Sequence, residues 1–515
     1  MLRKIIQLSA ISFQLSAKDI LLSITSGILL LLSFPDFNLW LFSWFGFVPL
    51  FFALNNKSRK EALFLFFITG IIFWSGIIYW LVHVTLAGTI LLILYLALYF
   101  AIFGLIIRPC TKHSTPYSLV FIPSVWVLLE YLRGHLLTGF PWALLGYSQY
   151  LNLPVVQIAD ITGAWGVSFV LMAVNVAIVE IIWSFRKGLW MRLRITVILL
   201  SSFLLLTLFY GYFRLSQHAA ADTQRPIRIS VIQGDIPQEL KWNTQARDYI
   251  VSKYLDISRQ SIKDKPNLII WPEAALPVIL EEEPIFFEQV EDFARGTNTP
   301  LLLGAVTLRG NLYYNSALLV SGSGETTSRY DKLHLVPFGE YIPLKNIFPF
   351  LETVVPIGDI AAGKNYTIFQ IPNSKITNRF AVLICFEDLF PELSRAFSRR
   401  GADFLINITN DAWYKKTSAA HQHLQASVFR AVENRRFLVR AANTGVSGFI
   451  APSGKIISLV QDKNGKDIFV DGYKTGEISV QKRNLSSYSR YGDIFPALCF
   501  LFVLYGIISP LKKKR

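Results

Sequence analysis

Hydrophobic residues divide this chain into three stretches of different character. Residues 1–213 are nearly continuous apolar runs, 214–491 alternate apolar and polar positions as globular proteins do, and 492–515 return to the apolar pattern. A membrane-spanning helix needs about 20 mainly apolar residues. Runs of that kind predict about eight spans, at residues 17–35, 38–54, 61–83, 86–107, 116–133, 163–184, 193–213 and 492–511. We therefore expect a membrane domain with seven transmembrane helices (1–213), a water-exposed domain (214–491), and a C-terminal transmembrane helix with a basic tail (492–515).

The water-exposed segment alternates β-rich runs with helical ones. Several β-rich runs are apolar throughout, which is typical of strands buried on both faces of a sheet. This alternation predicts an α/β domain whose helices cover the faces of the sheet. The predicted strands are 227–233, 267–271, 300–306, 312–320, 380–385 and 403–408, and the predicted helices are 244–262, 284–295 and about 419–440.

The composition agrees with a membrane protein. The chain is 52% hydrophobic and 17% charged, with a mean hydropathy of +0.42, whereas soluble chains carry about 25% charged residues. These values exclude a purely soluble protein, a disordered chain and a small disulfide-bonded scaffold.

The net charge of +15 is explained by topology better than by a nucleic-acid partner. Basic clusters punctuate the spans, and placing the N-terminus in the cytoplasm puts all of them on one side, as the positive-inside rule requires. The first span is then a retained anchor, the segment 214–491 lies on the outer side of the membrane, and the loops on that side contain one basic residue, Arg133. The clusters are Arg3–Lys4, Lys57–Lys60, Arg108–Lys112, Arg186–Arg194 and Lys512–Arg515.

The three cysteines fall in different parts of the chain, with Cys110 in a cytoplasmic loop, Cys499 in the last span and Cys385 in the outer domain. No disulfide can form within that domain, so Cys385 is either an inert core residue or a nucleophile.

Three motifs stand at the ends of predicted strands or loops: Glu273 in WPE, Lys332 in YDKLHLVPFGE and Cys385 in ICFED. Taken singly, each residue could have a purely structural role: a capping carboxylate, a surface lysine or a thiol packed in the core. Together they supply what a thiol nucleophile needs, because Glu273 can act as the base and Lys332 as the cation that stabilises a thiolate or an oxyanion. With the main-chain N–H of Phe386 as a second oxyanion donor, this set predicts acyl transfer through a thioester.

In this order the three motifs resemble the Glu-Lys-Cys triad of the nitrilase (carbon-nitrogen hydrolase) superfamily, over about residues 230–480. With the membrane part added, the chain resembles the apolipoprotein N-acyltransferases. The resemblance implies a polytopic helical membrane domain joined to an α/β nitrilase-like α-β-β-α sandwich. Further matching segments are Arg133-Gly134, Thr138–Trp142, Gln233-Gly234, Tyr313–Ser316, Asn410–Trp413 and Asn443–Gly445.

The resemblance implies the chemistry of the last step of bacterial lipoprotein maturation. An acyl chain passes from a phospholipid, usually phosphatidylethanolamine, to Cys385 and then to the α-amino group of the diacylglyceryl-cysteine that begins an apolipoprotein. Glu273 would act as general base and then general acid, and Lys332 would stabilise the oxyanion in a ping-pong reaction. A monomer in the bacterial inner membrane is implied, with the catalytic domain in the periplasm. We expect no metal and no cofactor.

The resemblance also assigns supporting roles. Glu340 would orient Lys332 and the substrate, and Glu387 would stabilise the loop that bears the nucleophile. The family often has Tyr directly after its Cys, where this chain has Phe386. The residues expected to contact substrate are Trp242, Trp142, Asn315 and Trp413, although Trp242 could equally be an aromatic anchor at the membrane interface.

Some neighbouring features have two interpretations. The loop 336–350 could enter the lipid interface or pack against the membrane part. His334 is expected to be structural, and His421 and His423 lack cysteines or carboxylates at zinc-binding spacing.

Two other functions remain open at this stage. A membrane-tethered amidase or nitrilase would use the same triad with water as the acceptor. A transporter or scaffold with a degenerate soluble domain would require the three motifs to be incidental. Apart from Glu130 and Glu180 near span ends, few intramembrane ionisable groups mark a transport path.

Overall fold

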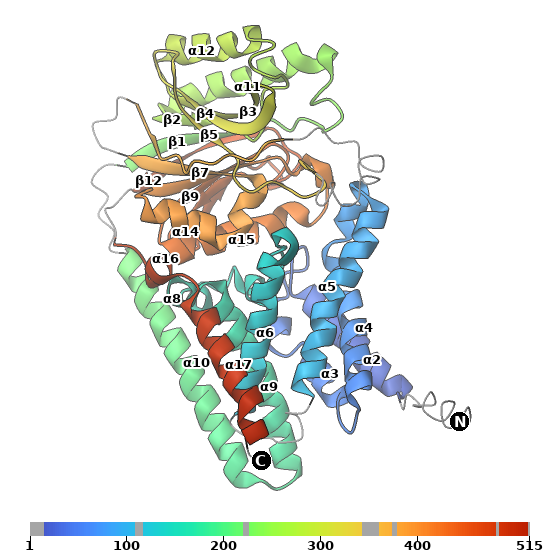
Figure 1. Cartoon of the computed structure of the whole chain (residues 1–515). Coiled ribbons are helices and arrows are strands. Elements are labelled where there is room, and N and C mark those ends of the chain that lie inside the picture. Colours follow the sequence, from blue (N-terminus) through green and yellow to red (C-terminus); the bar gives the residue numbers. More distant parts are fainter. Residues whose placement is uncertain are drawn as a thin grey trace.

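The molecule is a layered α/β domain stacked on a bundle of long helices (Figure 1). The computed structural model describes residues 15–108, 117–219, 226–341, 360–372, 378–479 and 484–512. Arg3, Lys4, Cys110, Lys112, most of the loop 336–350 and residues 513–515 lie outside the described residues.

Five helices among the described residues are long and apolar enough to cross a membrane. They coincide with predicted spans and are α4 (Arg59–Ile77), α5 (Leu86–Ile107), α6 (Ser118–His135), α9 (Ala164–Arg186) and α10 (Trp190–Ala219). The first and last predicted spans fall on helices α2 (Ala17–Leu32) and α17 (Ile494–Lys512).

The predicted span at 38–54 is not a single helix. It forms the 3-10 helix η1 (Trp40–Trp44) and the six-residue helix α3 (Val48–Ala53). Proline occupies the first turn of α3, where its missing N–H and fixed φ favour the start of a new helix. The prediction of about eight continuous spans was therefore too simple at this point. Short helices also lie between α6 and α9, at η4 (Leu136–Thr138), η5 (Leu145–Gln149), α7 (Leu153–Val156) and α8 (Ala159–Thr162).

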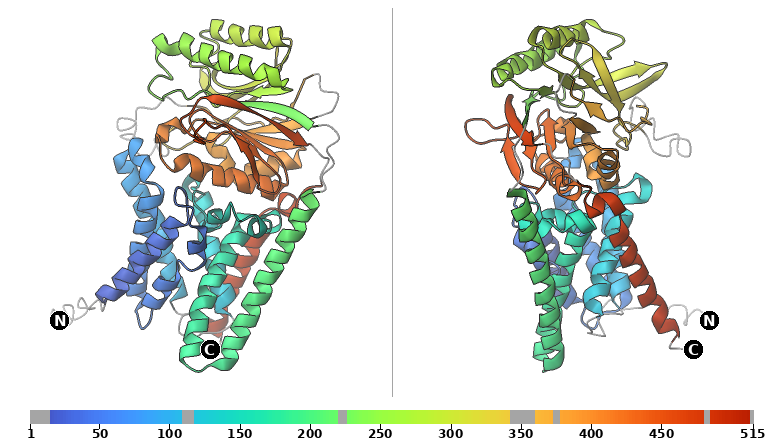
Figure 2. Two further views of the ribbon diagram at one scale, coloured as in Figure 1. Left: turned by 180° about the vertical axis from the view of Figure 1, so that it is seen from behind. Right: turned by 90° about the vertical axis from the view of Figure 1, so that its left-hand side faces the viewer.

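Aromatic side chains fill the interior of the helix bundle. The rings of Phe47, Phe100 and Phe103 lie 4.9 to 5.1 Å from the ring of Trp126 on α6, all in edge-to-face geometry, which is a favoured arrangement for such pairs. Helix α4 packs on α2 and α5, while α9 packs on α6 and α10. The same groups lie together in both views of Figure 2.

Two six-stranded sheets form the centre of the α/β domain. Their orders are β12-β1-β2-β3-β4-β5 and β11-β10-β9-β8-β7-β6. Strands β1, β2 and β3 of one sheet run parallel to one another, as do β7, β8 and β9 of the other. The remaining pairs of neighbouring strands are antiparallel. The strands are β1 (Pro226–Gln233), β2 (Leu268–Ile270), β3 (Leu301–Arg309), β4 (Leu312–Val320), β5 (Thr326–Asp331), β6 (Phe369–Gln370), β7 (Arg379–Ile384), β8 (Phe404–Thr409), β9 (Leu438–Ala442), β10 (Gly448–Ile450), β11 (Ile456–Leu459) and β12 (Gly472–Ser479).

Helices cover the outer face of each sheet. In Figure 1, α11 (Arg247–Ser261) and α12 (Ile285–Thr297) lie over the first sheet, while α14 (Pro391–Arg399) and α15 (Ala419–Asn434) lie between the second sheet and the membrane helices. The layers are helix, sheet, sheet and helix, which confirms the predicted α-β-β-α sandwich.

The third predicted helix was too long. Helix α15 ends at Asn434 because Arg435 adopts the left-handed conformation, with a φ of 52°. The apolar residues after it form β9 in the centre of the second sheet. An apolar run that continues from a buried helix into a buried strand offers no change of pattern at the boundary.

Helix α15 joins the two bodies of the molecule, and every residue of it except His421 is buried. The side chain of Gln422 accepts hydrogen bonds from the indole N–H groups of Trp142 (2.7 Å) and Trp80 (3.1 Å), both from the membrane part. Its amide also donates to the main-chain oxygen of Ile77 at 3.1 Å. The α/β domain therefore packs directly on one end of the bundle of membrane helices.

Candidate active site

The carboxylate of Glu273 stands directly after β2, where the chain leaves the first sheet. Main-chain hydrogen bonds fasten this turn to β3, since Trp271 N–H donates to Leu302 at 2.8 Å and Ala275 N–H donates to Gly304 at 2.8 Å. A Cβ atom on Gly304 would lie 2.6 Å from the Cα of Glu273, so only glycine permits this approach. The turn thus holds Glu273 in a fixed and largely buried position.

Lys332 follows β5 and is 1% exposed. Its Nζ lies 2.9 Å from an oxygen of Glu340 and 3.7 Å from an oxygen of Glu273. Asn315, on the neighbouring strand β4, donates from its amide nitrogen to both carboxylates, at 2.7 Å to Glu273 and 2.9 Å to Glu340. These four side chains form one buried cluster, as the sequence predicted for Glu273, Lys332 and Glu340.

Cys385 begins the 3-10 helix η8 (Cys385–Leu389) at the end of β7, and its φ is 54°. A non-glycine residue in the left-handed region is strained, and such residues are frequent at functional sites. The side chain of Asn407 on β8 donates to the main-chain oxygens of Leu383 (3.2 Å) and Cys385 (3.1 Å), which secures this bend. Phe386 lies in the first turn of η8, where N–H groups have no acceptor within the helix.

Glu387 connects the loop after β5 with the loop that bears the cysteine. Its carboxylate accepts main-chain hydrogen bonds from Leu333 and Ile384, both at 2.7 Å, and from His334 at 3.1 Å. The hydroxyl of Tyr330 donates to it as well, at 2.8 Å. Burial raises the pKa of Glu387 to about 7, although these donors lower it. The geometry agrees with the stabilising role expected for Glu387.

The charges and the burial of the site determine the protonation states of Lys332 and Cys385. Burial alone would lower the pKa of Lys332, but the charges of Glu340 and Glu273 outweigh it and raise that pKa above its usual range. Burial and the charge of Glu273 raise the pKa of the Cys385 thiol, and Lys332 opposes them only in part. At neutral pH the lysine is therefore an ammonium and the cysteine a thiol, so the thiol needs a base.

The structure separates the tryptophans that were expected to contact substrate. Trp242 is 47% exposed and lies in a turn of the α/β domain, and Trp413 is 52% exposed and lies in the 3-10 helix η9 (Asp411–Tyr414). Trp142 is 2% exposed and is held at the junction by Gln422. Only Asn315 among these residues contacts Glu273 directly.

A second buried cluster, which the sequence did not predict, lies behind the cysteine loop. His423 on α15 bridges the carboxylates of Asp388 (2.8 Å) and Asp411 (2.9 Å). Arg440 on β9 pairs with the same two carboxylates at 3.1 and 3.2 Å. The available signal was a charged residue inside the apolar strand run around Arg440, and partners this distant in sequence could not be identified from it.

Lys241 is a further buried residue near the site, and the sequence pattern did not single it out. It stands in the polar turn after β1, is 3% exposed, and donates from Nζ to the main-chain oxygen of Glu273 at 2.9 Å. A lysine beside glutamine, glutamate and tryptophan is otherwise typical of a solvated surface turn.

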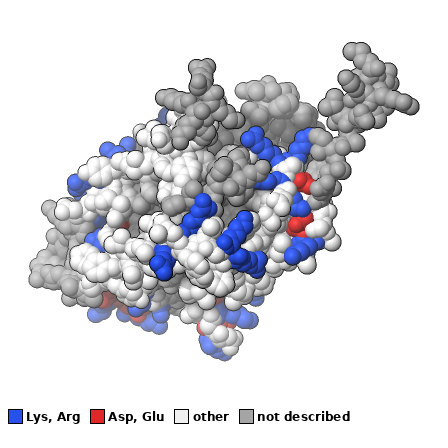
Figure 3. Space-filling model, turned by 90° about the horizontal axis from the view of Figure 1, so that it is seen from below, with Lys and Arg blue, Asp and Glu red and all other residues white. Residues whose placement is uncertain are grey.

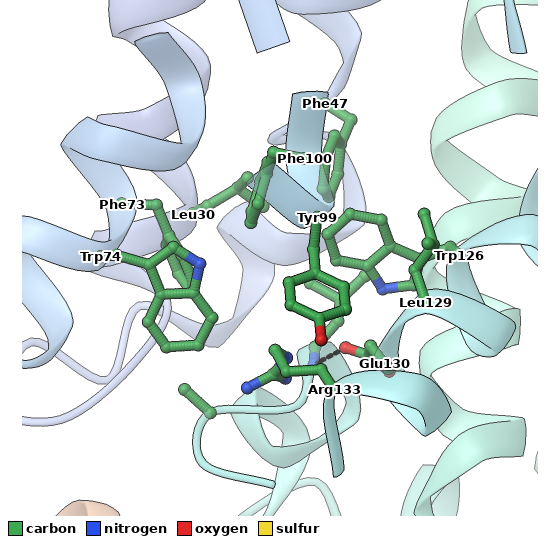
Figure 4. Close-up of a pocket in the computed structure, with 12 residues that line it drawn as sticks. Leu30, Phe47, Phe73, Trp74, Tyr99, Phe100, Trp126, Leu129, Glu130 and Arg133 are labelled. Atoms are coloured by element: carbon green, nitrogen blue, oxygen red, sulfur yellow. Dashed lines mark hydrogen bonds between the residues drawn. The ribbon is translucent and has the colours of Figure 1, made fainter. Parts of the chain in front are cut away.

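The membrane part contains a cavity lined mainly by aromatic and aliphatic side chains, with Glu130 and Arg133 at one side (Figure 4). Arg133 donates to the main-chain oxygens of Phe140 (2.8 Å) and Trp142 (2.6 Å), and Glu130 accepts from the N–H of Leu145 at 2.6 Å. These two charged residues thereby hold in place the loop that contains Trp142, and this loop lies at the junction between the membrane part and the α/β domain.

Comparisons with known proteins agree with both halves of the molecule. Residues 26–177 match the family model described as the apolipoprotein N-acyltransferase N-terminal domain, and residues 228–474 match that of carbon-nitrogen hydrolase. The chain is 38% identical to an apolipoprotein N-acyltransferase of Geobacter metallireducens over 501 residues, which cover 94% of this chain and 93% of the relative. It is 30% identical to that of Haemophilus influenzae, with 96% and 95% covered.

Among solved structures, the chain is similar to a mutant of a Nesterenkonia AN1 amidase from the nitrilase superfamily. The sequence identity is 18%, the TM-score is 0.39, and the match covers 51% of this chain and 93% of that one.

Proposed function

The chain belongs to the apolipoprotein N-acyltransferase family, and from that premise we propose that it moves an acyl chain from a membrane phospholipid to the N-terminal amine of diacylglyceryl-cysteine on apolipoproteins. This is the last, N-acylating step of bacterial lipoprotein maturation. One observation carries the proposal: a buried glutamate, lysine and cysteine converge in a domain that rests on membrane helices.

In the first half-reaction, Glu273 takes the proton of the Cys385 thiol, and the sulfur attacks the ester carbonyl of the phospholipid. The ammonium of Lys332 and the main-chain N–H of Phe386 stabilise the oxyanion. Glu273 then returns the proton to the departing oxygen, so a lysophospholipid leaves and a thioester remains on Cys385. Glu340, paired with Lys332 at 2.9 Å, keeps the lysine charged and in place.

In the second half-reaction, the neutral α-amine of the apolipoprotein attacks the thioester. Glu273 transfers a proton from the amine nitrogen to the cysteine sulfur, which leaves as a thiol, and the product is an amide. Because the two substrates react one after the other through one covalent intermediate, the kinetics are ping-pong. Asn315, whose amide nitrogen donates to both Glu273 and Glu340, holds the two carboxylates in position during both steps.

The two substrates are both lipids, and the position of the domain suits them. We propose phosphatidylethanolamine as the acyl donor and a diacylated apolipoprotein as the acceptor. The exposed rings of Trp242 and Trp413 are placed to contact such substrates, and the buried Trp142 supports the site from the membrane side. One chain carries all three reacting groups, which agrees with a monomer.

The charge distribution supports a bacterial inner-membrane orientation with the α/β domain in the periplasm. Figure 3 views the end of the bundle away from that domain, and Lys and Arg side chains gather there. Exposed basic residues at helix ends include Arg59, Lys60, Arg186, Lys187 and Arg192. By the positive-inside rule this end is cytoplasmic. The proposed parts are a membrane domain (1–213), a periplasmic catalytic domain (214–491) and a C-terminal helix with a basic tail (492–515).

The decisive experiment is intact mass of the full chain in detergent after incubation with phosphatidylethanolamine. The wild-type protein should gain the mass of one acyl chain in a hydroxylamine-labile form, and Cys385→Ala should gain nothing. Adding a diacylglyceryl-cysteine peptide should then discharge the adduct and yield an N-acylated peptide.

Absence of the wild-type adduct would contradict acyl transfer from phospholipid. Discharge to water at the same rate with and without the peptide would indicate a hydrolase instead.

A further inference from the structure

Two buried lysines flank Glu273, and their surroundings differ sharply. Lys332 pairs with the carboxylates of Glu340 and Glu273. Lys241 is 3% exposed, yet among the residues that the structure describes no carboxylate oxygen lies within 4.0 Å of its Nζ. Within the described parts of the chain, the single hydrogen bond that this Nζ makes is to the main-chain oxygen of Glu273, at 2.9 Å.

A single neutral acceptor is poor compensation for a buried ammonium. The charged form has three N–H donors and no lone pair, whereas the neutral amine leaves fewer donors without partners. A buried charge without a paired counter-charge is expensive and tends to lose its ionisation instead. Burial accordingly lowers the pKa of Lys241 to about 8, even though the charges of Glu273 and Cys385 raise it.

We propose that Lys241 is a positioning residue of the active site, which fixes the main chain of Glu273 and, by gaining or losing its proton, sets how readily that carboxylate accepts the proton of the Cys385 thiol. This inference rests on the proposed function. It concerns a residue that acts through Glu273 and does not itself touch the substrate.

The direction of the effect follows from the two charges that act on Lys241. Glu273 interacts with it more strongly than Cys385 does. When the thiol proton moves, negative charge leaves Glu273 and develops on the sulfur and the oxyanion. A charged Lys241 favours the charge remaining on Glu273, so it opposes the transfer, whereas the neutral amine does not. At an effective dielectric of about 20 the difference amounts to about fivefold in rate.

The test compares two variants of the full chain that represent the neutral and the charged form of Lys241. Lys241→Met is neutral at every pH, and Lys241→Arg stays charged at every pH used. The rate of thioester formation is measured by quenched intact mass with phosphatidylethanolamine between pH 6.5 and 9.5. No peptide acceptor is added, because an α-amine titrates in the same range.

The wild-type rate should rise about fivefold through pH 8. Both variants should lose this rise, and the Met variant should be faster than the Arg variant. Lys241→Gln, which is neutral but retains an N–H donor for the oxygen of Glu273, keeps the test informative if the Met variant does not fold. Lys263→Met, at an exposed position, is the matched control and should retain the wild-type profile.

A rise through pH 8 that persists in the Met and Gln variants would overturn the proposal, and so would equal, pH-independent losses in the Met and Arg variants. If the wild-type protein forms no adduct at any pH, the proposed function itself fails. An adduct with a flat wild-type profile contradicts only the role of Lys241.

Discussion

Two clusters of charged residues meet at Cys385, one on each sheet of the sandwich, and they are built differently. On the first sheet, Lys332 lies 2.9 Å from Glu340 but 3.7 Å from Glu273, so the carboxylate that we propose as the base is the looser partner. On the second sheet, His423 and Arg440 each contact both Asp388 and Asp411 at 2.8 to 3.2 Å.

This difference suits the first cluster to proton transfer and the second cluster to stabilising the fold. In the second-sheet cluster two cations balance two anions, which is the arrangement that a buried charge network needs to be stable. In the first-sheet cluster the charges are less evenly matched, and Glu273 retains the freedom to accept a proton. Replacing the proton acceptor Glu273 of the first cluster by its amide should therefore cost activity with little loss of stability, whereas removing a cation from the second cluster should cost stability.

The largest expected effect is that of Glu273→Gln. The amide cannot accept the thiol proton, so thioester formation should fall about a thousandfold. Lys332 keeps its pair with Glu340, and the melting temperature in detergent should stay close to that of the wild-type protein. Quenched intact mass and a thermal melt check the two halves of this prediction. A large drop in the melting temperature would show that Glu273 belongs with the supporting cluster.

Lys332→Met should slow thioester formation about a hundredfold, because one oxyanion donor is lost. The variant also leaves Glu273 and Glu340 without their shared cation. The same assay measures this, with Lys263→Met as a control for the loss of a lysine at the surface. A rate within a few fold of wild type would exclude Lys332 from the stabilisation of the oxyanion.

His423→Gln should instead destabilise the fold by about 3 kcal/mol, since two buried carboxylates lose a shared cation. Adding Asp411→Asn removes one of the negative charges and restores the balance with Arg440. The double variant should therefore melt closer to the wild-type temperature than the single variant does. Melts of wild type, both single variants and the double variant complete the cycle. Purely additive losses would mean that the two side chains are not coupled.

The smallest effect is a pH dependence of that stability. Burial and Arg440 lower the pKa of His423, but Asp388 and Asp411 outweigh them and raise it to about 9. Its contribution is thus fully present below about pH 6.5 and is lost as the pH rises through about 9. The difference in melting temperature between wild type and His423→Gln should shrink from pH 6.5 to pH 10. His421 is retained in both proteins, so its own titration cancels. A constant difference would argue against a charged His423.

The fold class and several of its elements could be predicted from the sequence because their signals are local. The motifs around Glu273 and Cys385 follow apolar runs, and the strand at 312–320 was predicted with its observed bounds. Strand β5, which precedes Lys332, was not predicted, because its residues are mostly polar. Lys241 could not be recognised, because its burial depends on a contact with Glu273, which is distant in sequence.

The remaining errors also have physical causes. The helix predicted to reach residue 440 ends at Asn434, where the only signal is the backbone conformation of Arg435. The span predicted at 38–54 contains a proline that starts a second helix, and hydropathy does not register such a break.

The burial of α15 has a consequence for how the protein is made. A helix that is buried on all sides is not stable until both of its neighbours are present, and here these are the second sheet and the ends of the membrane helices that contact it. The ribosome completes helices α2 to α10 first and α17 last. Most of the membrane helices on which the α/β domain packs are therefore synthesised before that domain. Expressed alone, residues 214–491 would leave Gln422, Gln425 and Glu433 of α15 without the hydrogen-bond partners that the membrane part provides, so this fragment should be less stable than the full chain. Attempts to obtain a soluble catalytic fragment should therefore redesign the face of α15 that contacts the membrane part before shortening the chain.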